Sequence, residues 1–143
     1  MRISNLLSAK GSSVATIAPD ATVADAISEL RGHGIGALVV SSDTHHIEGI
    51  VSERDIVRAL AERAQTLLEE PVSSIMSANV TTCSPDAHVE SLMSVMTERR
   101  IRHVPVVRDG QLCGIVSIGD VVKNRIDELE KDRDELVDYI NAR

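Results

Sequence analysis

The chain has 143 residues, 43% of them hydrophobic and 26% charged, with a formal net charge of −7 at pH 7. This composition is typical of a soluble globular protein with one ordinary core, or with two small units that share one. The acidic balance and the single aromatic residue, one Tyr with no Phe or Trp, exclude a general nucleic-acid surface, which needs basic side chains and stacking rings.

No stretch approaches the roughly 18 apolar residues of a membrane-spanning helix, so we expect no membrane partner and predict a cytoplasmic location. The first residues, MRISNLLSAKGSS, contain no long apolar run. The two cysteines, Cys83 and Cys113, occur singly and in no Cys-x-x-Cys spacing. This pattern predicts two free thiols in a reducing compartment.

An internal repeat organises the chain. The segment VATIAPDATVADAISEL (14–30) matches VTTCSPDAHVESLMSVM (80–96) at an offset of 66 residues. The offset falls by one further on, where GIVSERDIV (49–57) matches GIVSIGDVV (114–122). Self-similarity of this kind indicates a duplicated structural unit.

Each copy predicts the same order of elements, β-α-β-β-α. A short strand (14–17 and 80–83) precedes Pro-Asp, and a helix with apolar residues at helical spacing follows. Thr22-x-x-Asp25 is a start signal for the first of these helices, and two glycines supply its end. Two apolar strands joined by a polar turn come next, and then a helix that begins at Ser-x-x-Asp.

The repeat predicts an α/β (α+β) fold made of two copies, residues 1–66 and 67–125, followed by a helical extension at 126–143. Pro105 lies within the predicted strand IRHVPVV. Because proline cannot donate to a strand ladder, we expect it at an edge or a bend.

The final segment predicts a helix of about 22 residues, roughly 33 Å long. Its apolar stripe has a heptad-like spacing and charged flanks, as in a helix that packs against another helix. Two interpretations stay open, packing onto its own domain and a contact in a homodimer. The stripe consists of Val122, Ile126, Leu129, Arg133, Leu136 and Ile140.

The pair Ser52 and Asp55 recurs as Ser117 and Asp120. A serine at this place caps a helix, and an acid three residues later favours the positive helix end. The pair recurs, however, while the two residues between its members change, and a capping box prefers Glu or Gln where this chain has Asp. A helix that starts directly after a strand can also receive a polar ligand, so the pair is a candidate for both roles.

The Pro-Asp-x-x-Val opening, the IRHVPVV strand and the Gly-h-h-Ser-x-x-Asp close (h, hydrophobic) together resemble the cystathionine β-synthase (CBS) domain, in two copies over residues 3–130. SERD, RIRHVPV and VSIGD are similar to free-standing tandem CBS proteins, which carry no attached enzyme or transporter. The resemblance implies two repeats packed about a pseudo-twofold axis, with two clefts. It also implies a non-catalytic regulatory protein that senses adenine nucleotides and requires no metal.

The resemblance further assigns residues to the ligand. Ser52 and Asp55 serve the ribose in one cleft, and Ser117 and Asp120 in the other, since a carboxylate can accept from two hydroxyls at once. AMP is the first candidate, with ADP, ATP or NAD(H) as alternatives. The residues expected at the adenine are Thr16, Ala37, Thr82, His103, Val104 and Pro105. Those expected at the phosphates are Arg54, Arg102, His103 and, as a weaker candidate, Lys10.

The copies are unequal around these positions. Gly119 stands where the first copy has Arg54, and Gly36 and Ala37 stand where the second copy has Arg102 and His103. We therefore expect the two clefts to differ in affinity, and we expect ligand binding to change how the repeats or two chains meet.

Other functions are less well supported. GIVSIGD misses the Gly-x-Ser-x-Gly nucleophile elbow by one position, and no Rossmann or P-loop glycine pattern occurs. His45 and His46 are adjacent on a predicted turn, and no carboxylate pattern completes a metal site around them. Two alternatives stay open: a dimeric scaffold acting on an unidentified partner enzyme without an essential ligand, and a binder of S-adenosylmethionine.

Overall fold

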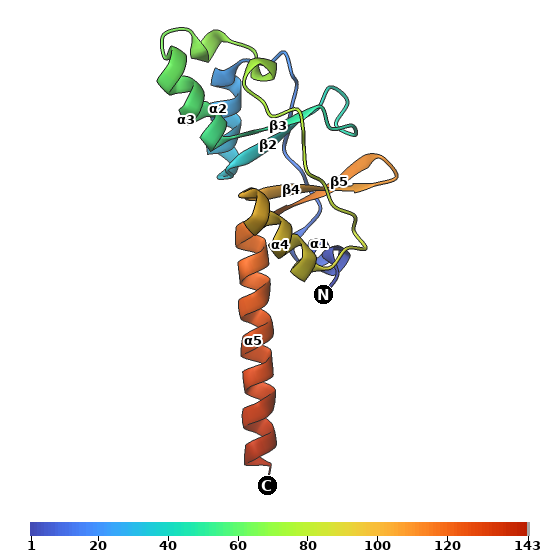
Figure 1. The fold of residues 1–143 in the computed structure, drawn as a ribbon. Helices are drawn as coiled ribbons and strands as arrows, with labels where there is room; N and C mark the ends of the chain where they lie inside the picture. Colours follow the sequence, from blue (N-terminus) through green and yellow to red (C-terminus); the bar gives the residue numbers. More distant parts are fainter. Residues whose placement is uncertain (143) are drawn as a thin grey trace.

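The computed structural model describes residues 1–142 as two small α/β halves and a long helix that projects from the second half (Figure 1). The mixed fold and the two-copy architecture predicted from the repeat are confirmed. In chain order the elements are α1 (Ile3–Lys10), β1 (Thr16–Ile17), α2 (Val23–His33), β2 (Ala37–Val40), β3 (Gly49–Ser52), α3 (Glu53–Arg63), the short 3₁₀ turns η1 (Leu67–Glu69) and η2 (Val72–Ser74), α4 (Val89–Arg99), β4 (His103–Arg108), β5 (Gln111–Ser117) and α5 (Ile118–Asn141).

The first half is a three-stranded sheet covered by α2 and α3. β1 runs parallel to β2, and β2 runs antiparallel to β3. All four residues of β2 are buried, as expected for the central strand of a covered sheet. Thr22 and Ser52 begin the two helices, each with a capping box in which the acid three residues later bonds back to the cap.

The second half repeats this plan with a weaker first strand. The hairpin β4–β5 is formed, but the strand predicted at 80–83 is reduced to a single parallel bridge between Cys83 and Val106. In the first half, the N–H of Val39 donates to the carbonyl of Ala15 at 3.2 Å. Pro105 holds the equivalent place and has no N–H, so the ladder stops there.

Pro105 lies inside β4, an edge strand whose outer side pairs only through that bridge, so the edge position expected for it is confirmed. Its carbonyl accepts from the N–H of Cys83 at 3.1 Å, and on the other side of the strand it is paired with Ile115. The missing donor faces the side on which pairing is limited to one bridge, which is how the sheet tolerates a proline.

The two cores exchange segments relative to chain order. Helix α1, at the N-terminus, packs Ile3, Leu6 and Leu7 into the core of the second half, whereas Leu67 and Val72 pack into the core of the first. The predicted boundary between residues 66 and 67 follows chain order, so it stays a prediction, and packing crosses it. Hereafter "first half" and "second half" refer to these two cores.

A second register in the sequence explains the exchange. ISNLLSAK (3–10) matches VSSIMSAN (72–79) at an offset of 69 residues. The backbone confirms the equivalence, because the N–H of Ile3 donates to Ala87 at 2.9 Å and the N–H of Val72 donates to Ala21 at 2.7 Å. Helix α1 thus has the same place in the second half that η2 and the following residues have in the first.

Helix α5 is one continuous helix of 24 residues that begins at the Ser117 cap. It covers the second core with Val121 and then leaves the body of the protein, so that its C-terminal turns project freely (Figure 1). Five members of the predicted stripe are at least 47% exposed, namely Val122, Ile126, Leu129, Leu136 and Ile140. Packing onto its own domain therefore does not account for the stripe. Residue 143, the last of the predicted extension, lies outside the described residues.

No helix within residues 1–142 is long and apolar enough to cross a membrane.

Candidate functional site

Two clefts lie between the halves, one beside each Ser-x-x-Asp helix start. The first cleft, of about 500 Å³, includes Ser52 and Asp55 among its lining residues. The second, of about 570 Å³, includes Ser117 and Asp120. The backbone repeats around them, since the N–H of Glu53 donates to Gly36 at 3.0 Å in the first half and the N–H of Ile118 donates to Arg102 at 2.8 Å in the second.

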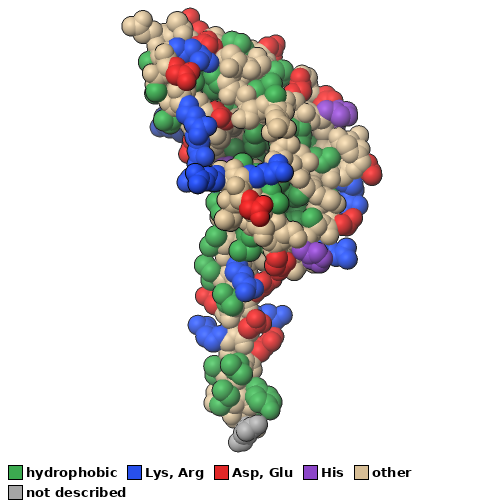
Figure 2. Space-filling model, viewed as in Figure 1, with side chains coloured by type: hydrophobic (Ala, Val, Ile, Leu, Met, Phe, Trp, Pro, Cys, Tyr) green, Lys and Arg blue, Asp and Glu red, His purple; other side chains and the backbone are tan. Residues whose placement is uncertain are grey.

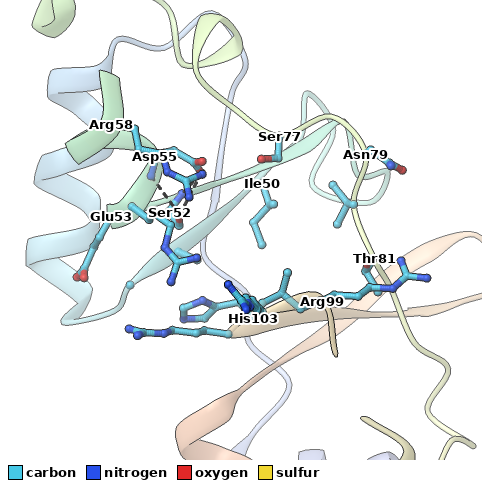
Figure 3. A pocket seen from close by; sticks show the side chains of 17 residues that line it. Ile50, Ser52, Glu53, Asp55, Arg58, Ser77, Asn79, Thr81, Arg99 and His103 are labelled. Atoms are coloured by element: carbon cyan, nitrogen blue, oxygen red, sulfur yellow. Dashed lines mark hydrogen bonds between the residues drawn. The ribbon is translucent and has the colours of Figure 1, made fainter. Parts of the chain in front are cut away.

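In the first cleft, the carboxylate of Asp55 is only partly used by the protein. Its Oδ2 accepts from the backbone N–H and the hydroxyl of Ser52 at 2.8 and 3.0 Å. Its Oδ1 accepts no hydrogen bond from any described residue. The pair thus caps α3 and still offers a half-buried acceptor to the cleft (Figure 3).

Five arginines line the same cleft: Arg54, Arg58, Arg99, Arg100 and Arg102. Arg99 donates to the hydroxyl of Thr81 at 3.1 Å. The guanidinium groups of the other four form no ion pair or hydrogen bond with the described part of the chain. Figure 2 shows Lys and Arg side chains gathered beside the hollow between the halves.

This arrangement is electrostatically unfavourable without an anion. Among the described residues, only two acids, Glu53 and Asp55, line the cleft against the five cations. Arg54 and Arg58 are also four residues apart on α3, a spacing at which like charges destabilise a helix. Multiple arginines with free guanidinium donors are suited to phosphate, which they can bind through two N–H groups at once.

Arg100 shows backbone strain at the same site. Its φ is 55°, in the left-handed region, where it ends α4. The equivalent residue in the first half is Gly34, with φ 64°, which ends α2. Glycine adopts this conformation without steric cost and arginine does not. A strained cationic residue in a cleft is an indication of function.

The second cleft has a different charge pattern. Lys10, from the end of α1, places its Nζ 2.6 Å from Oδ2 of Asp120 and 2.8 Å from the carbonyl of Ile115. Burial alone would raise the pKa of Asp120, but hydrogen bonds from Lys10 and Ser117 outweigh it and hold that pKa below its usual value. Lys10 thus reaches the predicted ribose acceptor in this structure.

His103 lies between the clefts and lines both, as do Gly36 and Ala37. The imidazole packs on the first half, since a Cβ at Gly36 would lie 3.3 Å from its Cε1. Burial lowers the pKa of His103, and the charge of Glu53 only partly opposes this. A neutral imidazole at pH 7 offers hydrogen bonds to a ligand but little charge to a phosphate.

The structure brings together most of the residues assigned to ribose and phosphate. Ser52, Asp55, Arg54 and Arg102 meet in the first cleft, Ser117, Asp120 and Lys10 meet in the second, and Ala37 and His103 line both. Of the residues assigned to the adenine, some line the clefts and others do not. Thr16 and Thr82 line neither cleft, Val104 is fully buried in the second core, and Pro105 is buried in β4.

Sequence reasoning missed several lining residues. The strand-end positions in the clefts are Val14 and Ala15 in one and Val80 and Thr81 in the other, just before the predicted threonines. Side chains alternate across a strand, so an assignment shifted by one residue points to the wrong face. Arg58 could have been found from its place one helical turn after Arg54 and Asp55, whereas Arg99, Arg100 and Asn79 required the fold.

No group of three or more His, Cys, Asp or Glu side chains within the described residues is arranged to hold a metal ion. The cysteines Cys83 and Cys113 are free and half-buried, and burial raises the pKa of the Cys83 thiol to about 11. A thiol with such a pKa is a poor nucleophile at neutral pH.

Comparison with known proteins agrees with the fold and the two-copy organisation. A family model described as CBS domain matches residues 11–62 and 72–127. A crystal structure of a CBS-domain containing protein from Agrobacterium tumefaciens is 42% identical with a TM-score of 0.85, and the match covers 87% of this chain and 99% of that one. A mitochondrial CBS domain-containing protein of Arabidopsis thaliana is 34% identical over 98% of this chain and 72% of its own length. A hexameric CBS-CP12 protein from bloom-forming cyanobacteria is 28% identical with a TM-score of 0.73, over 85% of this chain and 69% of that one.

Proposed function

Because this chain belongs to the CBS domain family, we propose that it is a non-catalytic regulatory module that binds an adenine nucleotide between its halves. CBS-pair proteins are generally regulatory modules that bind adenosine-containing ligands. Binding would change how the two halves, or two chains, lie against each other, because a ligand shifts an equilibrium only through different affinities for two arrangements. A cytoplasmic location stays a prediction.

The observation that carries this proposal is the first cleft. There, one oxygen of Asp55 is free to accept from ribose hydroxyls, and four guanidinium groups that have no partner within residues 1–142 line the same space. A diol acceptor beside unpaired guanidinium groups is complementary to a nucleotide, which carries hydroxyls and phosphate on one sugar. Figure 3 shows Ser52 and Asp55 on one side of this cleft and Arg99 and His103 on the other.

The charge of the first cleft also orders the candidate ligands. The five arginines exceed the two acids by three, which suits a ligand with more than two negative charges better than a monophosphate. We therefore place ADP and ATP ahead of AMP for this cleft. NAD(H) stays an alternative, because its two diester phosphates together carry no more negative charge than the monoester of AMP. S-adenosylmethionine carries a sulfonium cation, which like-charge repulsion from the arginines disfavours.

Calorimetric titration with AMP, ADP, ATP, NAD(H) and S-adenosylmethionine tests the proposal. We expect binding to weaken at least tenfold in Asp55→Ala. Asp25→Ala is the matched control, because Asp25 closes the same kind of capping box on α2 but lies outside both clefts. Both variants lose a cap, so only the effect of the ligand site separates them. Equal nucleotide binding by the two variants, or no binding by the parent, would refute the assignment.

A second candidate function is a dimeric scaffold, and α5 is the observation that favours it. The stripe of exposed Val, Ile and Leu along this helix would be covered by an equivalent helix of a second chain. Nucleotide binding and a homodimer are compatible. If every titration gave no heat while the chain was dimeric, the scaffold would be the primary function, and an unidentified enzyme its partner.

A further inference from the structure

Equivalent segments of the two halves line the two clefts. Residues 99–103 line the first cleft and residues 33–37 line the second, and the repeat relates these segments at an offset of 66. Ile50 and Ile115, and the helix starts that follow them, correspond in the same way at an offset of 65. The clefts are also similar in volume, about 500 and 570 Å³. A difference between their ligands therefore depends on the side chains at equivalent positions rather than on the space available.

The second cleft has no arginine among the described residues that line it. Three of the five positions held by arginine in the first cleft are glycine in the second, one is histidine and one is lysine. The histidine, His33, is already bonded through Nε2 to Glu29 at 3.1 Å. The lysine, Lys123, is exposed on α5 and lies outside the lining of the cleft. In the order Arg54, Arg58, Arg99, Arg100 and Arg102, the counterparts are Gly119, Lys123, His33, Gly34 and Gly36.

The charges that remain in the second cleft cancel. Its described lining contains one lysine and one acid, Lys10 and Asp120, whose Nζ and Oδ2 atoms lie 2.6 Å apart. His103 adds little charge at pH 7, because burial holds its pKa below the usual value. With both histidines neutral, the described lining has a net charge of zero, whereas five arginines against two acids give +3 in the first cleft.

A polyphosphate chain has no unpaired cation to meet in the second cleft. Binding it would move several negative charges out of water toward a single ammonium that Asp120 already holds, and a partly buried charge without a partner is costly. An uncharged nucleoside has no such cost. Its ribose hydroxyls can donate to Oδ1 of Asp120, because Lys10 and Ser117 both bond to Oδ2, and its base can lie against the apolar part of the lining. That part consists of Val14, Ala15, Ile35, Ala37 and Ile115.

We propose that the second cleft selects adenosine derivatives that carry little or no negative charge, while the first cleft takes the polyphosphates. This inference rests on the proposed nucleotide function, and it assigns a ligand class to the cleft that the charge argument for ADP and ATP does not cover. One chain then holds two different adenosine derivatives at once, one in each cleft.

Calorimetric titration of the full chain with adenosine, in the presence of saturating ATP, tests this inference. ATP should occupy the first cleft and leave the second open, so the ATP-saturated chain should still bind one equivalent of adenosine. We expect Asp120→Ala to lose this adenosine site and Asp55→Ala to keep it, because each carboxylate lines its own cleft. Added salt should weaken the binding of ATP but not that of adenosine, since only ATP binding depends on charge.

An arginine introduced into the second cleft should change its selectivity. Gly119→Arg places at the start of α5 the cation that Arg54 provides at the start of α3. The backbone accepts a side chain there, because a Cβ on Gly119 would meet nothing nearer than the hydroxyl oxygen of Ser117 at 3.6 Å. ATP should then compete for this cleft and weaken adenosine binding to the ATP-saturated chain by about tenfold. Gly119→Gln is the matched control, since it adds a polar side chain without charge and should leave adenosine binding as it is in the parent.

The outcomes separate this inference from the proposed function. An ATP-saturated chain that takes up no adenosine overturns the inference, and so does equal competition by ATP in Gly119→Arg and Gly119→Gln. Titration of the unmodified chain with ATP alone gives the distinction. Two equivalents of ATP bound with similar affinity would leave the nucleotide function in place and refute only the difference between the clefts, whereas no binding of any adenosine derivative would refute both.

Discussion

Gly49 and Met76 lie in direct contact, so that a Cβ on Gly49 would stand 2.6 Å from the sulfur of Met76 and 2.9 Å from the carbonyl of Ser77. Gly114 has the same relation to Leu7, whose two methyl carbons would lie 2.8 Å from an added Cβ. In each half, a β-strand glycine thus contacts the segment that is exchanged between the two cores.

Alanine at Gly49 and alanine at Gly114 should lower the free energy of unfolding by different amounts, because the atoms around the two glycines differ in how easily they can move. We expect Gly49→Ala to lower the free energy of unfolding by about 2–3 kcal/mol, because a backbone carbonyl must move. Gly114→Ala should cost about 1–2 kcal/mol, because the flexible end of Leu7 can shift. Gly32→Ala is the control: it meets no atom within 4 Å in α2 and should stabilise by about 0.5–1 kcal/mol. Urea unfolding measures all three, and equal effects would contradict this account.

Replacing Arg100 by glycine should have opposite effects on the stability of the protein and on its affinity for ATP. We expect Arg100→Gly to raise the free energy of unfolding by about 0.5–1 kcal/mol, since it relieves a left-handed conformation. The same change should weaken ATP binding several-fold, because it removes a guanidinium group from the first cleft. Arg100→Ala removes the charge without the relief, so it should weaken binding with no gain in stability. Unchanged ATP affinity in both variants would exclude Arg100 from the site.

His103 should make stability depend on pH below neutrality. Burial lowers its pKa from the usual 6.5, Arg102 and Lys10 act in the same direction, and Glu53 and Asp120 oppose them. The unfolded chain therefore binds the proton more readily, so the contribution to stability is complete above pH 6.5 and decreases as the pH falls through the lowered pKa. We expect His103→Gln to flatten this decrease in urea unfolding between about pH 7 and pH 5.

The control for His103 is His88, an exposed residue at the start of α4 that lines neither cleft. His88→Gln should leave the slope of stability against pH as it is in the parent. A slope that persists in His103→Gln and disappears in His88→Gln would show that another part of the chain carries the pH dependence.

The stripe of α5 should control the oligomeric state. If two chains meet along α5, Leu129→Glu combined with Leu136→Glu places charges in the seam and should convert a dimer into a monomer, as measured by light scattering after gel filtration. Lys131→Glu, on the opposite side of the helix, should leave the mass unchanged. A parent that is already monomeric at high concentration would refute the contact.

The sequence by itself determined the repeat, the order β-α-β-β-α in each copy, and the Ser-x-x-Asp helix starts, because each depends on local periodicity, caps and turns. It also singled out Asp55 and Asp120 as candidates for the ribose, since each follows a serine by three residues in both copies, and that role stays a prediction. The prediction of the first strand of the second copy was wrong by several residues. Its length depends on Pro105 of the neighbouring strand, which has no N–H to extend the ladder.

Only the tertiary structure decided which segments meet. The exchange of α1 and η2 between the cores joins residues that are far apart in the chain: Lys10 and Asp120 are 110 positions apart. The arginines of the first cleft likewise come from α3 and from the end of α4 with the following turn. The local sequence pattern determines which serine and carboxylate stand at a helix start. The cationic side chains that face this carboxylate come from distant segments, so they depend on tertiary packing, and the two clefts differ for this reason.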